Sequence, residues 1–185
     1  ACTLLEADAA PVCEALERMI LSEELITEQE AIYLPAFYHA ECGAARRLKE
    51  LAESAGRTLF TTELDPGVLT AETGIDYDDV QLAAIRQAVT SKVMVLTGGP
   101  GTGKTTTTQG IIAALKKAGL RVLLAAPTGR AAKRMSEATG MDAKTIHRLL
   151  EYNPQDGYKR GDENPLDGDA LIVDCLLYTS DAADE

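Results

Sequence analysis

The feature that most constrains this chain is the segment 93–108, VMVLTGGPGTGKTTTT. Its first four residues, 93–96, are apolar without polar alternation, which predicts a short buried strand. A glycine-rich turn then runs into Lys104 and Thr105, where the apolar spacing of a helix begins. A strand, the pattern G-x-x-x-x-G-K-[ST] and a helix, in that order, are typical of a loop that binds the phosphates of a nucleotide triphosphate. The alternative is a glycine-rich turn with an incidental lysine.

The residue types of this loop suit an anion. Glycines let the backbone bend so that successive N–H groups point at a phosphate, and a side chain there would block its approach. The first turn of the helix adds unpaired N–H groups and a partial positive charge. We expect Lys104 to bridge the β- and γ-phosphates and Thr105 to offer its hydroxyl to Mg²⁺. The residues expected around the phosphates are Gly99, Pro100, Gly101, Thr102, Gly103, Lys104, Thr105 and Thr106.

Composition limits the class of protein. The chain has 185 residues, 45% of them hydrophobic, enough for one ordinary domain or parts of two. No apolar run approaches a membrane span, and the N-terminus has no signal-like pattern. The four cysteines share no close spacing, so we expect free thiols in a reducing cytoplasm rather than a metal site or disulfides. Because the sequence starts without Met, we expect it to be a fragment of a longer protein.

Charge is segregated along the chain, whose net charge is −11. Residues 1–80 carry 5 basic and 17 acidic side chains, residues 81–150 carry 11 and 2, and residues 151–185 carry 2 and 10. The basic block contains the phosphate loop and the motifs that follow it. A positive surface there suits polyphosphate and a nucleic-acid backbone. The alternative is a solvated helix face that happens to be basic.

Residues 1–73 are predicted to form an acidic helical region followed by a linker. Apolar spacing predicts an amphipathic helix over 12–20, a short strand over 31–34 and a second helix from Pro35 to about Ser54. The pattern is broken over 57–73, which contains the turn signal Asp-Pro-Gly, and this predicts the linker.

From residue 74 onwards helices and strands alternate. Asp76 and Asp78 are candidate N-caps for a helix through Val89. Gln81 lies near the start of that helix, shortly before the phosphate loop, where a carboxamide could read an adenine edge because it both donates and accepts. After the loop, residues 122–126 form a second apolar strand.

The segment after this second strand carries the remaining candidate site residues. A turn at 127–129 leads into a basic helix, and 143–150 predicts a further short helix. Residues 152–169 are polar and turn-rich, which predicts a long surface loop. A third strand over 170–173 ends in Asp174, and a strand-terminal carboxylate beside a phosphate loop can hold Mg²⁺ through water.

Several motifs fall in one order. They are Gln81, GGPGTGKTT at 98–106, APTGRAAKRM at 126–135, TIHRLL at 145–150 and NPLDGDALIVD at 164–174. In this order they resemble the N-terminal motor domain of RecD-like superfamily 1 DNA helicases, over about residues 76–174. The first motif is generic to phosphate-loop proteins, whereas GRAAKRM followed by TIHRLL is more specific.

The resemblance implies an α/β fold: a P-loop NTPase, RecA-like parallel sheet, incomplete here and preceded by the small helical region. It implies ATP-dependent movement along single-stranded DNA, from 5′ to 3′, with recombination or repair nuclease subunits as further partners. Gln81 would contact adenine, and Thr105 and Asp174 would serve the metal, so that Lys104 and Asp174 are the expected catalytic residues. Residues expected along the DNA track are Pro127, Thr128, Gly129, Arg130, Thr145 and His147.

The chain departs from the family after Asp174. The family has a Glu at the next position, which orients the attacking water, whereas this chain has Cys175. The residues 175–185 resemble nothing in the family, so we expect them to be a foreign tail. The expected organisation is therefore 1–73, a truncated motor domain over 74–174 and this tail, with the second motor domain and its arginine finger absent. Such a fragment is expected to lack unwinding and efficient ATPase activity.

Three alternatives stay open. The chain could belong to another phosphate-loop enzyme, such as a nucleotide kinase or an ATPase that needs no DNA. It could be a nucleotide-binding module without catalysis. It could also fail to fold stably, because three strands of an unfinished parallel sheet leave an edge and an apolar face uncovered.

Overall fold

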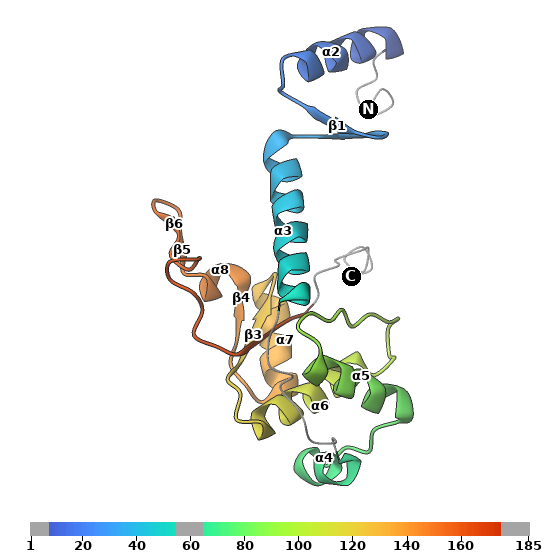
Figure 1. Cartoon of the computed structure of the whole chain (residues 1–185), viewed down its shortest axis with the longest axis vertical. Helices are drawn as coiled ribbons and strands as arrows, with labels where there is room; N and C mark the ends of the chain where they lie inside the picture. The colour runs from blue at the N-terminus through green and yellow to red at the C-terminus, as the bar shows by residue number, and fades with distance from the viewer. Residues whose placement is uncertain (1–7, 55–64, 175–185) are drawn as a thin grey trace. The chain divides into compact units, whose positions relative to one another are not determined.

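The computed structural model describes residues 8–54 and 65–174 (Figure 1). The chain divides into two compact units, Ala1–Gly56 and Arg57–Glu185. The expected tail at 175–185 lies outside the described residues, as does the first part of the expected linker. In the described segments, no helix has both the length and the apolar character needed to cross a membrane.

The described part of unit 1, residues 8–54, consists of two helices joined by a hairpin. Its elements are α2 (Ala9–Leu21), β1 (Ile26–Glu28), β2 (Ala31–Tyr33) and α3 (Pro35–Glu53). The two strands pair antiparallel, with Ile26 opposite Tyr33. Pro35 occupies the first turn of α3, where its missing N–H leaves no bond unmade. Both predicted helices are confirmed, and the strand predicted over 31–34 is present as 31–33.

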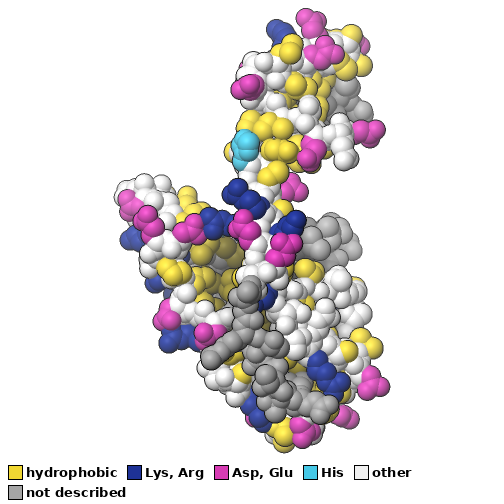
Figure 2. Space-filling model, in the orientation of Figure 1, with side chains coloured by type: hydrophobic (Ala, Val, Ile, Leu, Met, Phe, Trp, Pro, Cys, Tyr) yellow, Lys and Arg dark blue, Asp and Glu magenta, His cyan; other side chains and the backbone are white. Residues whose placement is uncertain are grey.

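The described part of unit 1 has no fully buried side chain. Large apolar side chains lie on its surface instead, among them Leu21 and Phe37, which are 83% and 69% exposed. Figure 2 shows hydrophobic side chains spread over the face of this unit that is turned to the viewer. The described residues of unit 1 therefore form no fully buried core of their own.

Three helices form one side of unit 2. They are α4 (Pro66–Thr73), α5 (Asp79–Thr90) and α6 (Lys104–Lys117), and α6 packs against both of the others. The buried side chains between them include Leu69, Ile85 and Leu115. Gly110 permits this close packing, because a Cβ there would lie 2.4 Å from Ile85 Cδ1.

The second half of the expected linker is helical. Asp65 caps α4 by accepting a hydrogen bond from the Gly67 N–H (2.8 Å), and Pro66 opens the helix. The Asp-Pro-Gly segment, predicted as a turn in a linker, instead starts a helix, because Asp followed by Pro is equally typical of a helix N-terminus. Lys117 of α6 pairs with Glu72 of α4 at 3.2 Å, so this helix belongs to unit 2.

A three-stranded parallel sheet completes the core of unit 2. Its strands are β3 (Val122–Ala126) in the centre, with β4 (Ala143–Thr145) on one side and β7 (Ala170–Val173) on the other. The helix α7 (Gly129–Thr139) packs on β3 and β4, and α6 also contacts β3. Helices alternating with a parallel sheet confirm the predicted α/β fold.

Two details of the sheet differ from the sequence prediction. Residues 93–96 form no strand, and Val95 is 81% exposed. A β-strand is defined by its backbone hydrogen bonds to a neighbouring strand. This segment pairs with none of the three strands described for the parallel sheet. Conversely, 143–145 was expected to begin a helix but forms the edge strand β4, and the helix α8 (Ile146–Leu149) starts after it.

The expected surface loop at 152–169 contains a small hairpin. Its strands β5 (Tyr152–Asn153) and β6 (Gly157–Tyr158) pair antiparallel, with Tyr152 opposite Tyr158. Gly157 has a φ of 76°, and the Gln155 N–H donates to the Asn153 side chain at 3.0 Å, so the turn between the strands is well defined.

Candidate nucleotide and nucleic-acid site

The phosphate loop has the backbone that its glycines predict. Gly101 and Gly103 have φ values of 72° and 77°, a left-handed conformation that side chains disfavour. At Gly98 a Cβ would lie 2.7 Å from Thr102 Oγ1, so a side chain there would displace Thr102. Gly103 is also the N-cap of α6, whose first-turn N–H groups therefore open onto the loop.

Lys104 is folded back over this loop. Its ammonium donates to the carbonyl oxygens of Gly98 and Gly99 at 2.7 and 2.6 Å. The Thr102 hydroxyl donates to the Gly99 oxygen as well, at 2.9 Å. These carbonyls thus keep the Lys104 ammonium at the loop. A bound phosphate would replace them as the acceptor of its hydrogen bonds.

Gln81 lies directly against the phosphate loop. It forms a capping box with Asp78: Asp78 Oδ1 accepts from the Gln81 N–H at 2.8 Å, and Gln81 Oε1 accepts from the Asp78 N–H at 3.1 Å. This fixes the carboxamide, and its Nε2 faces Gly103, where a Cβ would lie only 2.5 Å away. Gln81, the predicted adenine-binding residue, therefore lies next to the phosphate loop in the fold; the sequence placed the two near each other in the chain but did not predict this contact.

The other candidate residues gather at the carboxyl end of the sheet. Ala126, the last residue of β3, is opposite Thr145 in β4, and Ala125 is opposite Val173 in β7. Asp174 continues this edge, since its N–H donates to the Ala125 oxygen at 3.0 Å. This is the edge at which open α/β sheets bind ligands.

Two threonines of the predicted DNA track are helix caps. Thr128 accepts a hydrogen bond from the Ala131 N–H, and Thr145 accepts one from the Arg148 N–H, each at 3.2 Å. A hydroxyl that accepts a capping bond still has its own proton to donate. Both threonines can therefore hold a helix start and donate to a phosphate at the same time.

His147 contacts two aromatic rings that the sequence analysis did not single out. Its ring centroid is 5.5 Å from that of Tyr152 and 6.1 Å from that of Tyr158, and the two tyrosine rings are 4.8 Å apart. The segment YNPQDGY carried the signal for this, because a turn of Asn, Pro, Asp and Gly flanked by aromatic residues is typical of a hairpin.

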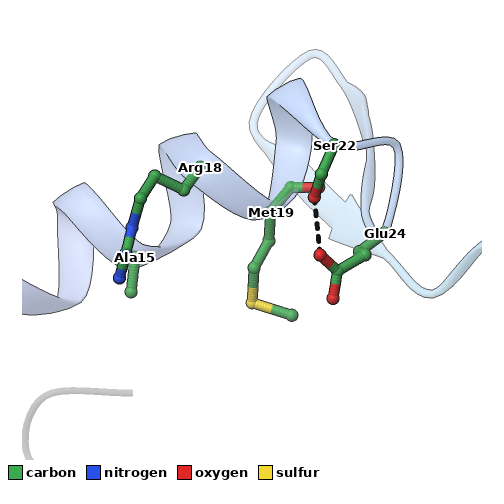
Figure 3. A pocket seen from close by; sticks show the side chains of 5 residues that line it. All are labelled: Ala15, Arg18, Met19, Ser22 and Glu24. Carbon is green, nitrogen blue, oxygen red and sulfur yellow. Dashed lines mark hydrogen bonds between the residues drawn. The ribbon is translucent and has the colours of Figure 1, made fainter.

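A pocket of about 330 Å³ lies elsewhere, on unit 1 (Figure 3). It is lined by Ala15, Arg18, Met19, Ser22 and Glu24, and the Ser22 hydroxyl donates to Glu24 Oε1 at 2.6 Å. None of the candidate site residues lines it. The open edge of the sheet and the phosphate loop, rather than this pocket, carry the predicted chemistry.

Among the residues that the structure describes, no group of three His, Cys, Asp or Glu side chains is arranged to hold a metal ion. A metal bound between the triphosphate, one hydroxyl and one carboxylate needs no such group, because phosphate oxygens and water supply most of its ligands. Thr105, at the start of α6, and Asp174, at the sheet edge, are both exposed. Their assignment to Mg²⁺ stays a prediction.

Comparison with known proteins decides the family. A family model described as an AAA domain matches residues 81–178, just over half of the chain. The chain belongs to this AAA domain family. The match begins at Gln81 and continues four residues past Asp174.

The similar proteins confirm the resemblance to RecD-like helicases. The ATP-dependent RecD2 DNA helicase of Deinococcus radiodurans is 38% identical over 170 residues, which are 89% of this chain and 22% of that protein. The RecBCD enzyme subunit RecD of Mycolicibacterium smegmatis is 39% identical over 119 residues, 51% of this chain and 22% of that protein. The ATP-dependent DNA helicase dda of phage T4 is 47% identical over 62 residues, which are 33% of this chain and 14% of that protein. The chain thus spans about a fifth of the first two relatives.

Proposed function

We propose that this chain is the nucleotide-binding part of an ATP-dependent DNA helicase. The observation that carries the proposal is the common location of its parts in unit 2. A glycine-rich loop leads into α6, which begins at Lys104, and Gln81 lies against that loop. The motif residues Thr145 and Asp174 lie at the carboxyl edge of one sheet. The names of the similar proteins support the same activity.

ATP would bind with its phosphates on the amides of residues 101–106, because Gly101 and Gly103 already have the φ values of such a cradle. Lys104 would leave the carbonyls of Gly98 and Gly99 for the terminal phosphates. Gln81 Nε2 would meet the adenine edge. A bound Mg²⁺ would neutralise charge on the triphosphate, and Thr105 and Asp174 are the residues proposed to hold it.

Single-stranded DNA would lie along the carboxyl edge of the sheet. The groups that would contact it are the N–H of Gly129, the hydroxyls of Thr128 and Thr145, the basic Arg130 and His147, with Pro127 shaping the turn. These groups bind phosphates without selecting bases, as a motor that moves along any sequence requires. Such an enzyme would act in the cytoplasm, from 5′ to 3′, alone or with nuclease subunits.

The decisive experiment compares ATP hydrolysis with and without single-stranded DNA in the intact gene product. We expect oligodeoxythymidylate to stimulate hydrolysis and a fluorescent partial duplex to be separated when ATP is present. Hydrolysis that DNA leaves unchanged would indicate another phosphate-loop enzyme. Nucleotide binding without any hydrolysis would indicate a binding module.

The 185-residue chain by itself is expected to bind nucleotide but to hydrolyse it slowly. Cys175 takes the position at which we expect the water-orienting Glu, and a thiol cannot accept the water proton as a carboxylate does. The variant Cys175→Glu of this chain, compared with the unaltered chain for its rate of ATP hydrolysis, tests the role of this position. A clear rise in hydrolysis would show that the position acts on the attacking water.

A further inference from the structure

We propose that His147, Tyr152 and Tyr158 form a stacking surface for an unpaired base of single-stranded DNA. This cluster, named here the aromatic triad, joins the helix α8 to the hairpin β5–β6. The proposal deepens the proposed function and rests on it, since it adds a base contact to the expected phosphate contacts.

The three rings lie close enough to act together. Tyr152 and Tyr158 face each other across the hairpin at a centroid distance of 4.8 Å, with their planes 51° apart. The His147 ring is nearly parallel to that of Tyr158, at 25°, and meets Tyr152 edge-on, at 75°. Rings from two separate elements thus build one aromatic surface next to the residue, Thr145, that caps α8.

This surface is open to solvent. Tyr152 and Tyr158 are 46% and 52% exposed, and His147 is exposed as well. A cross-strand aromatic pair can serve only to stabilise a hairpin, and such a pair contributes up to about 1 kcal/mol. Here the aromatic surface continues onto α8, outside the hairpin. Stabilising the hairpin does not require an exposed ring on a different element.

Hydrogen bonds hold the hairpin that carries two of the three rings. Arg160, which follows β6, donates to Glu151 Oε1 through Nε at 2.8 Å, and its Nη1 donates to Asn164 Oδ1 at 3.2 Å. The turn is fixed by Asn153 Nδ2, which donates to Asp156 Oδ2 at 3.1 Å. A surface held in this way loses little conformational entropy when a base stacks on it.

The charges nearest the rings in sequence are mainly basic, although the block 151–185 that contains both tyrosines is acidic overall. Residues 144–160 contain four basic side chains and two acidic ones. Both acids already have partners, Glu151 with Arg160 and Asp156 with Asn153. The exposed Lys144, Arg148 and Lys159 flank the rings in sequence. Figure 2 shows charged and hydrophobic side chains interspersed over this region. Cations beside exposed aromatic rings match a strand that alternates phosphates with bases.

A tryptophan reporter tests the contact. The chain contains no Trp, so Tyr158→Trp places a single indole in the triad and keeps a stacking ring. We expect its fluorescence to be quenched by oligodeoxythymidylate and left nearly unchanged by an abasic oligonucleotide of the same length. Equal quenching by both would overturn the proposal, since phosphates alone would then account for it.

Binding by the unaltered chain supplies the second readout. Fluorescence anisotropy should show oligodeoxythymidylate binding about tenfold more tightly than the abasic strand, the scale of one stacked base. The double variant Tyr152→Ala/Tyr158→Ala should lose that preference, whereas Tyr152→Phe/Tyr158→Phe should keep it. An alanine variant that is folded by circular dichroism and keeps the preference contradicts the triad. If the alanine variant unfolds, the tryptophan reporter decides.

Failure of the triad and failure of the proposed function give different results. If the chain binds oligodeoxythymidylate and the abasic strand equally, it binds DNA through phosphates alone. The stacking contact is then contradicted and the proposed function is kept. A chain that binds neither strand but still binds a fluorescent ATP analogue contradicts both the triad and the DNA part of the proposed function. A chain that prefers thymidylate but binds no nucleotide keeps the triad and loses the ATP site.

Discussion

The carboxamide of Gln81 and the backbone of Gly103 are in direct contact, so close that a Cβ at Gly103 would lie 2.5 Å from Gln81 Nε2. Gln81 is held there by its capping box with Asp78, while Gly103 starts α6 with a φ of 77°. The side chain of Gln81, the candidate adenine-binding residue, therefore packs directly on the phosphate loop. A change in either residue is expected to disturb the other.

Replacing Gly103 by alanine tests this link. The strained φ should lower the free energy of unfolding by about 1–3 kcal/mol, and the new methyl group should also displace Gln81. We therefore expect the affinity for a fluorescent ATP analogue to fall at least tenfold. Urea unfolding and anisotropy measure the two effects.

Gly119 provides the matched control. Its φ is 76°, close to that of Gly103, but a Cβ there would meet nothing within 4 Å. Gly119→Ala should therefore carry the same backbone strain and leave nucleotide affinity unchanged. Equal losses of affinity in the two variants would show that strain alone, not the contact with Gln81, is responsible.

The lysine of the loop gives a second prediction. In Lys104→Ala the nucleotide affinity should fall tenfold or more, because a charge-assisted bond to phosphate is worth about 1.5–3 kcal/mol. Stability should change little, since the ammonium bonds only to carbonyls of the exposed loop residues Gly98 and Gly99. Lys116→Ala, at the other end of the same helix, is the control for lost charge. Unchanged affinity in Lys104→Ala would remove the basis of the proposed function.

A third prediction concerns the packing of α5 on α6. A Cβ at Gly110 would lie 2.4 Å from Ile85 Cδ1 and 3.0 Å from Tyr77 Cε1, both of them buried side chains. Gly110→Ala should therefore destabilise unit 2 by about 1–3 kcal/mol, the usual range for overpacking. In α3 of unit 1, Gly43 has nothing within 4 Å of such a Cβ, so Gly43→Ala should be neutral or slightly stabilising. Thermal unfolding compares the two.

The sequence predicted the parts of the fold that local chemistry determines. The helices α3 and α5 begin where Pro35 and Asp78 predict, and β3 and β7 are the apolar runs expected of buried parallel strands. The glycines of the phosphate loop have the conformation that their type implies.

What the sequence did not predict depends on partners distant in the chain. Residues 93–96 have the composition of a strand but no pairing strand among the described residues, whereas the weak pattern at 143–145 becomes a strand because β3 lies beside it. The contact between Gln81 and Gly103 and the aromatic triad are likewise tertiary. Spacing along the chain carries no information on which loop a side chain meets.

Thr145 allows capping to be separated from DNA binding. Its oxygen accepts the Arg148 N–H that starts α8, and its own proton remains for a phosphate. Thr145→Ala should lose both functions: the free energy of unfolding should fall by about 1 kcal/mol, and the affinity for oligodeoxythymidylate should fall as well.

Thr145→Asp keeps an accepting oxygen, so its stability should stay near that of the unaltered chain, but it adds a negative charge and has no proton to donate. We therefore expect Thr145→Asp to bind DNA more weakly than Thr145→Ala, although it is the more stable of the two. If DNA affinity instead followed stability across both variants and Thr145→Ser, the hydroxyl would act only as a cap, and this threonine would not belong to the DNA track.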